Sequence, residues 1–482
     1  KAENRHPFFL GFNTLAGLIL FTAFVLPRSE AASQFLFGLS LSRFLIATFF
    51  FLLLLLSLAA TLLVTLQLGA WQENLRGKLA AFFTRYQKEA LIFSYALFIF
   101  TSAFLLLTIP PIILPLAVLA PFSARLSSLI GWFFISSIVF IILLRTTLSK
   151  EEKTTALLQK LDHLLTLYGI FIITFFLYVR YTFLIGWVGK TKYSFFDILA
   201  EAFVQGRLYI KNPPYVHDLT PYQGRWYVPM PPLPAILLIP LAYLVGAAGI
   251  STSYISIMVS ALNGVLLYKI FQELKRHGWL VLSESAIFIL LALFLFGTSH
   301  FWLGFSGRGW YFAQVLTVFF LALAIYAAMR ARSPWWIGVF VGMAIMTRPT
   351  AMMTTPFLLA ITLQITQDKG EKLEIKPILL WISKAAIPIL VAIASLLVYN
   401  YLRFENIFDF GYVTVNAGPE VVENVQRWGT FSLHFVPENL NVMLFKLPFW
   451  DPGGRWPLLP SAAGTSIFLV TPALIDLFRR SP

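Results

Sequence analysis

Long apolar stretches separated by short polar segments make up most of this chain. The run that begins at Phe44, FLIATFFFLLLLLSLAATLLVTLQLGAW, is longer than the roughly 20 residues that a helix needs to cross a bilayer. The pattern predicts about twelve membrane-spanning helices. They are expected to begin near Phe8, Phe44, Ala90, Leu126, Leu164, Ser253, Ser285, Tyr311, Trp335, Ala351, Leu379 and Thr465.

Lysine and arginine indicate how these spans are oriented. A few short segments hold 19 of the 36 lysines and arginines, and by the positive-inside tendency they face the cytoplasm, as does the N-terminus. The segments are 1–7, 71–89, 145–163, 272–280, 330–333, 367–378 and 479–480. Residues 189–231 are then outside, so the short apolar piece 233–246, broken by Pro240, should not cross. We expect it, and residues 112–120, to lie at the interface or to dip in and return.

The composition agrees with a polytopic α-helical membrane protein. Hydrophobic residues make up 58% of the chain, charged residues only 12%, and the mean hydropathy is +0.78. Orientation and anionic lipid headgroups account for the net charge of +14, so nucleic acid is not an expected partner. The absence of cysteine excludes a disulfide framework and a thiolate catalyst, and no cofactor or divalent metal is indicated. The chain begins at Lys1 without a methionine, and we expect the native chain to extend further.

The polar interruption at residues 193–240 carries the best candidate chemistry. Asp197 and Glu201 are four residues apart in FFDILAEAF, so a helix there would place both carboxylates on one face. Near lipid, such a carboxylate can act as a general base. The alternative is that the acids only form ion pairs with nearby cations, namely Lys192, Arg207 or Lys211.

Basic residues on the same side of the membrane could hold a phosphate. Arginine suits this task because it offers two parallel hydrogen bonds. Each cation alone could equally contact a lipid headgroup or pair with an acid, so their convergence on one face is the informative feature. The candidate set is Arg207, Lys211, Arg225, Arg308 and Arg348.

The second outer segment, residues 297–310, reads GTSHFWLGFSGRGW and is rich in glycine. Its glycines would let the backbone approach a ligand closely. His300 completes the candidate substrate-binding set, either as a hydrogen-bonding group that fixes the structure or as a proton carrier. The segment contains no acid.

The last outer segment, residues 403–464, is too polar and too rich in proline to span the membrane. We expect it to form an ordered lid or platform. Its acids and His434 show no spacing typical of a metal site or of a Ser/His/Asp set. Three regions are therefore expected: additional N-terminal spans at 1–150, a membrane core at 151–402, and the lid with the last span at 403–482.

The order of these motifs resembles that of bacterial membrane glycosyltransferases of the GT-C superfamily, the group that includes protein mannosyltransferases and lipid A aminoarabinose transferases. The resemblance rests on a span, an acid on an amphipathic helix, GRLYI, and Y-x-G-R-W-Y-V-P-x-P-P-L-P-A. It continues in GTSHFWLGFSGRGWYFAQ, VGMAIMTRPTAMM, LRFENIFDFGY and GTSIFLVTPAL, and covers the chain from Leu164 onward.

The resemblance implies a helical bundle with juxtamembrane helices in the first outer loop, and a polyprenyl-phosphate-linked sugar as the donor. An acid in that loop would take the proton of the acceptor hydroxyl while the sugar carbon is inverted. The matching acid here is Asp197, with Glu201 as the next, and Arg348 matches a basic position near the donor phosphate. The site would face outward from the plasma membrane, and the acceptor could be a protein, a lipid or a glycan.

Two other functions stay open. Many relatives also carry an acid in the second outer loop, and this chain has none, so a non-catalytic scaffold subunit with the same fold is one alternative. A lipid or sugar transporter is the other. It would need charged or polar residues near the middle of several spans, whereas the acids here gather near the surface.

Overall fold

The computed structural model describes residues 156–185, 191–370, 374–429, 432–450 and 464–478, with residues 95, 98, 99, 372, 458, 459 and 461. The first four predicted spans and the piece at 112–120 lie outside, or almost wholly outside, these residues. Contacts divide the chain into two units, 1–105 with 124–150 and 106–123 with 151–482. Every element described below belongs to the second unit.

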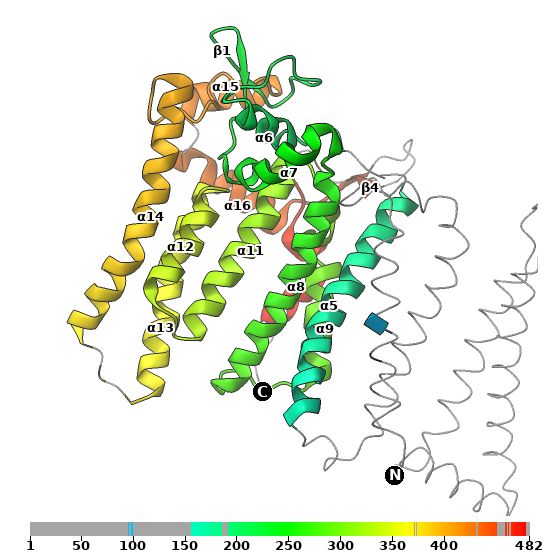
Figure 1. The fold of residues 1–482 in the computed structure, drawn as a ribbon, viewed down its shortest axis with the longest axis vertical. Coiled ribbons are helices and arrows are strands. Elements are labelled where there is room, and N and C mark those ends of the chain that lie inside the picture. Colours follow the sequence, from blue (N-terminus) through cyan, green and yellow to red (C-terminus); the bar gives the residue numbers. More distant parts are fainter. Residues whose placement is uncertain are drawn as a thin grey trace, which may run out of the picture. The chain divides into compact units, whose positions relative to one another are not determined.

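Four described helices are long and apolar enough to cross a membrane (Figure 1). They are α5 (Ala156–Leu184), α8 (Thr252–Arg276), α11 (Gly309–Met329) and α14 (Ile375–Phe404). They match the spans predicted near Leu164, Ser253, Tyr311 and Leu379. The helices α9 (Glu284–Phe296) and α10 (Ser299–Ser306) are bent by 55° and would add a fifth span if they act together.

Three further predicted spans coincide with helices shorter than a membrane span. The region near Trp335 is α12 (Pro334–Ile345), and the region near Ala351 is η4 (Pro349–Thr354) followed by α13 (Thr355–Asp368). Prolines cause these breaks, because Pro349 and Pro356 each sit in the first turn of a new segment. The region near Thr465 consists of α17 (Ile467–Val470) and η6 (Pro472–Phe478). The total of about twelve spans stays a prediction, since four lie outside the described residues.

The segment predicted to lie outside first along the chain, called the first outer segment, contains both a helix and a hairpin. Helix α6 (Phe196–Val204) is the helix expected around the acid pair. The strands β1 (Thr220–Tyr222) and β2 (Arg225–Tyr227) amend the all-α expectation, and they are joined by a two-residue turn. Both turn residues, Gln223 and Gly224, have positive φ, 47° and 73°, as a type I′ turn requires.

The short apolar piece after the hairpin forms α7 (Leu233–Gly249), which packs against α6. It has 17 residues, is kinked at Gly246, and falls below the length of the candidate spans. Figure 1 shows α6, α7 and β1 together at one end of the helical bundle. Whether α7 crosses a membrane or lies along it stays a prediction.

After α14 the chain forms α15 (Pro419–Trp428), η5 (Leu433–Phe435), α16 (Val436–Phe445), β3 (Phe449–Trp450) and β4 (Leu458–Leu459). Because α14 continues to Phe404, the predicted boundary between 402 and 403 falls inside a helix. The following segment joins the first outer segment through backbone hydrogen bonds. Asp218 N donates to Asn416 O at 2.8 Å, and Asn416 N donates to Leu219 O at 2.8 Å.

Small residues set the contact between α12 and α14. A Cβ at Gly338 would lie 2.2 Å from Ala385 O, and one at Gly342 would lie 3.1 Å from Pro388 O. The two glycines are four residues apart on one face of α12, so the backbones approach as in other membrane helix pairs with a Gly-xxx-Gly spacing.

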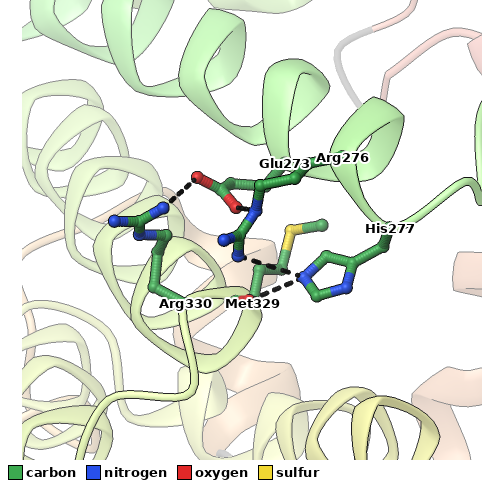
Figure 2. A network of polar contacts seen from close by, with 5 residues as sticks. All are labelled: Glu273, Arg276, His277, Met329 and Arg330. Carbon is green, nitrogen blue, oxygen red and sulfur yellow. Dashed lines mark hydrogen bonds and ion pairs between the residues drawn. The ribbon is translucent and has the colours of Figure 1, made fainter. Parts of the chain in front are cut away.

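Charged side chains join α8 to α11 at the end of the bundle opposite to α6. The buried carboxylate of Glu273 lies 2.6 Å from Arg276 Nε and 3.2 Å from Arg330 Nη1 (Figure 2). Beside this pair, His277 Nε2 donates to Met329 O at 2.9 Å. Two helix ends and the loop after α8 are therefore tied together around one acid.

Glu273→Gln is expected to lower the free energy of unfolding by about 1–3 kcal/mol, because it removes the charge that both guanidiniums face in a buried position. The matched control is Glu284→Gln, whose exposed ion pair with Lys275 should contribute about 1 kcal/mol or less. Denaturant unfolding of the purified protein in detergent measures both. Equal losses in the two variants would contradict the assignment.

Candidate functional site

The backbone just before α6 is strained. Tyr193 and Phe195 have φ values of 63° and 52°, and bulky aromatic residues seldom adopt this left-handed region. Such a residue costs on the order of 1–3 kcal/mol and persists only where the surroundings hold it in place. Here the amide of Gly309 donates to Tyr193 O at 2.9 Å, and a Cβ at Gly309 would lie 3.1 Å from Ser194 O. The start of α11 therefore fixes the start of α6.

Asp197 lies in the first turn of α6, directly after this strained segment. Its side chain is almost fully buried, with 2% exposed, among Phe196 and Leu199, which have no exposed surface. The N-terminal turn of a helix favours a negative charge, which offsets part of the cost of burial. Asp197 is thus held in one place, on the inner side of α6.

Glu201 is a turn away on the same helix, as predicted, but it has a different environment. Its Oε2 accepts a hydrogen bond from Ala247 N at 3.3 Å, and its Oε1 lies 3.7 Å from the position that a Cβ on Gly246 would take. Gly246 is where α7 departs from helical geometry, with φ 65° and ψ 169°. Glu201 therefore satisfies an amide at the kink of α7, and a joint catalytic role for the two acids stays a prediction.

Arg348 reaches the start of α6 through Trp310. Its Nη2 donates to Trp310 O at 2.6 Å, and the Trp310 ring stacks on Tyr193, with 6.0 Å between centroids and 29° between planes. Burial lowers the pKa of the Arg348 guanidinium, and the neighbouring Tyr412 opposes that shift. Its Nε is buried and has no hydrogen-bond acceptor among the described residues. Arg348 is half-buried, and a cation with a spare, buried donor atom is suited to an anion.

Arg207 and Arg225 form a second cationic group, whose ring contacts share no residue with the hydrogen bond that Arg348 donates. The Arg207 guanidinium lies 5.6 Å from the centre of the Tyr209 ring, and that of Arg225 lies 4.7 Å from it. Lys211 is exposed nearby in the sequence. The predicted convergence of cations on one face thus consists of at least two separate sets of contacts.

His300 belongs to α10 and lies inside the bundle, where it contacts α5 and α8. Its Nδ1 is 3.2 Å from Tyr178 Oη, and its Nε2 is 3.2 Å from Asn263 Nδ2. Since the amide of Asn263 donates to Nε2, Nδ1 carries the proton and donates to Tyr178, whose hydroxyl donates to Leu295 O at 2.5 Å. This network uses both ring nitrogens of His300, as the structural alternative requires, and the described contacts do not bring His300 to the cationic groups.

Two glycines of the predicted second outer segment, Gly304 and Gly307, serve helix packing. Residues 299–306 form α10 rather than a loop, and Thr298 caps the helix by accepting from His300 N at 3.2 Å. A Cβ at Gly304 would lie 2.5 Å from Ser260 Oγ, and one at Gly307 would lie 2.4 Å from Ser253 N. The close approach expected toward a ligand is therefore an approach of α10 to α8. Arg308 follows as the N-cap residue of α11 and is half-buried.

Arg403 is a buried cation that the sequence analysis did not select. Only 2% of its surface is exposed, and it donates to Val228 O at 2.5 Å and to Asn400 Oδ1 at 2.8 Å. Its guanidinium also stacks over the ring of Tyr399 at 3.9 Å and that of Phe404 at 4.6 Å. Arg403 thereby fixes the end of α14 to the residue that directly follows β2. The signal was present in LRFENIFDFGY, where a basic residue ends a long apolar helix.

Two glycines have the same left-handed backbone but different surroundings. Substituting each by alanine distinguishes the cost of the backbone conformation from the cost of a steric clash. Gly206 and Gly307 have φ values of 69° and 64°, but a Cβ at Gly206 would meet nothing within 4 Å. Gly206→Ala is expected to cost about 1 kcal/mol of stability, and Gly307→Ala roughly 2–4 kcal/mol because it also pushes α10 from α8. Denaturant unfolding of both variants tests this, and a smaller loss at Gly307 would refute the packing role.

Within the described residues, no group of three or more His, Asp or Glu side chains could hold a metal ion. The features that could bind or transform a ligand are the buried carboxylate of Asp197 and the two cationic groups. Comparison with known proteins finds no matching family, curated protein or solved structure.

Proposed function

We propose that this protein is a membrane glycosyltransferase that moves a sugar from a polyprenyl-phosphate-linked donor to an acceptor hydroxyl at the outer face of the plasma membrane. Asp197 serves as the general base. As the acceptor oxygen bonds to the anomeric carbon, the carbon–oxygen bond to the phosphate breaks. The hydroxyl proton goes to the Asp197 carboxylate, the polyprenyl phosphate leaves, and the sugar carbon is inverted.

The observation that carries the proposal is the strained backbone at Tyr193 and Phe195 directly before a buried carboxylate. Neither strain nor a buried acid stabilises a fold, and both recur at sites where a reacting group must be held in position. The strained segment is held by Gly309 and Trp310, so the acid is positioned by the rigid start of α11. Proton transfer by a group held in this way contributes about 10²–10⁴ in rate.

Arg348 supports the same reaction because it places positive charge beside the segment that carries Asp197. A leaving phosphate gains charge as the bond to the sugar breaks, and an arginine that is already held in place stabilises that charge without reorganising. Its Nη2 is held by Trp310 O, which leaves Nε for a ligand. Glu201 has a supporting role in this scheme, since its carboxylate holds the kink of α7.

Asp197→Asn is expected to lower the rate of sugar transfer by about 10²–10⁴ while the protein still folds, because the amide cannot accept the proton. Purified protein in proteoliposomes, supplied with a panel of polyprenyl-phosphate hexoses and pentoses and with membrane extract as acceptor, allows detection of products by mass spectrometry. Glu284→Gln, an exposed acid at the opposite end, is the control and should keep the wild-type rate.

A wild-type rate in Asp197→Asn would contradict the proposal and would favour the scaffold alternative. Thermal unfolding of the two variants identifies a loss of activity that comes only from misfolding.

A further inference from the structure

Two arginines from separate segments meet at one tyrosine near the hairpin. Arg207 follows α6, and Arg225 begins β2, yet their guanidiniums lie 5.6 Å and 4.7 Å from the centre of the Tyr209 ring. Arg225 and Lys211 are exposed, and Arg207 and Tyr209 are half-buried, so the group opens to the surroundings. It is accessible to a ligand, in contrast to Arg403.

Local structure holds this arrangement in place. Helix α6 ends at Val204 and is followed by the C-cap Gln205 and by Gly206, whose φ is 69°. Arg207 N donates back to Ala202 O at 2.8 Å, which is the Schellman pattern of a helix end. The chain then runs beside β2, where Ile210 N donates to Trp226 O at 2.8 Å. Arg225 is the first residue of β2 and directly follows the type I′ turn at Gln223 and Gly224. Both arginines are therefore set by hydrogen-bonded backbone.

The described residues do not neutralise the charges of this group. Among the described residues, no carboxylate lies within ion-pair distance of Arg207 or Arg225. Arg207 Nη2 donates only to the neutral Gln205 Oε1, and Arg207 Nη1 is buried without an acceptor. Two guanidiniums that face one ring repel each other, and the stack on Tyr209 offsets only part of that cost. An anion with several acceptor oxygens would satisfy both.

We propose that Arg207, Arg225 and Tyr209 form a phosphate-binding site distinct from the contacts of Arg348. The ligand is a phosphate group, supplied either by a phospholipid headgroup at the membrane surface or by a soluble phosphate. Arginine recognises it through paired hydrogen bonds, and the Tyr209 ring keeps the two guanidiniums in place. The inference does not depend on the proposed transfer reaction.

The experiment compares wild-type protein with Arg207→Gln/Arg225→Gln in two binding measurements. Native mass spectrometry counts phosphatidylglycerol retained from mixed phosphatidylglycerol and phosphatidylcholine micelles, and thermal shift follows titration with inorganic phosphate. Loss of two charge-assisted contacts should weaken binding by on the order of tenfold to a hundredfold. A difference only in the first measurement identifies a headgroup as the ligand, and a difference in the second identifies a soluble phosphate.

Arg427→Gln is the matched control, because Arg427 is another exposed arginine, with its guanidinium 5.2 Å from the centre of the Trp428 ring. It is expected to bind as the wild type does. Equal binding by wild type and the double variant in both measurements, or an equal loss in Arg427→Gln, would overturn the proposal. Asp197→Asn should retain full binding, so a failure of the transfer reaction and a failure of this site are distinguishable.

Discussion

An ionised side chain is costly to remove from water, and this cost organises the described part of the protein. Asp197, Glu273 and Arg403 are the acidic and basic residues buried there. Glu273 faces two arginines, and Arg403 donates to a carbonyl and an amide while it stacks on two rings. Glu273 thereby joins α8 to the end of α11, and Arg403 joins α14 to the residue after β2. Asp197 lies in the first turn of α6, directly after the strained backbone at Tyr193 and Phe195, and we propose that it carries the chemistry.

The end of the bundle that holds α6 is assembled from segments far apart in the sequence. The hairpin is fixed to α14 through Arg403, residues 216–220 pair with 411–416, and α7 is joined to α6 through Glu201. These contacts leave Arg348 beside the start of α6, and Arg207 with the exposed Arg225 near the hairpin. A rigid support beneath two cationic groups is what a protein needs if it binds phosphates at a membrane surface.

Length and hydropathy were enough to locate α5, α8, α11 and α14, because they alone decide whether a helix can span a bilayer. A helix around Asp197 and Glu201 was also expected, and α6 has both acids one turn apart. The separate roles of the two acids could not be predicted, since the role of Glu201 depends on how α7 passes beside α6. The strain at Tyr193 and Phe195 gives no sequence signal, because aromatic residues disfavour that conformation. The sequence contains Gly304 and Gly307, but only the structure shows that both approach α8.

The central claim is that the hairpin end of the bundle faces outward, where a lipid-linked donor and its acceptor can meet. The chain has no cysteine, so single cysteines can report this directly. Gln223 lies in the hairpin turn, and Arg332 follows α11 at the opposite end of the bundle. Both positions are exposed, so each can be replaced by a cysteine, as Gln223→Cys and Arg332→Cys. In intact cells treated with a membrane-impermeant maleimide, the account predicts labelling of Gln223→Cys at once and of Arg332→Cys only after permeabilisation. The reverse pattern would contradict it.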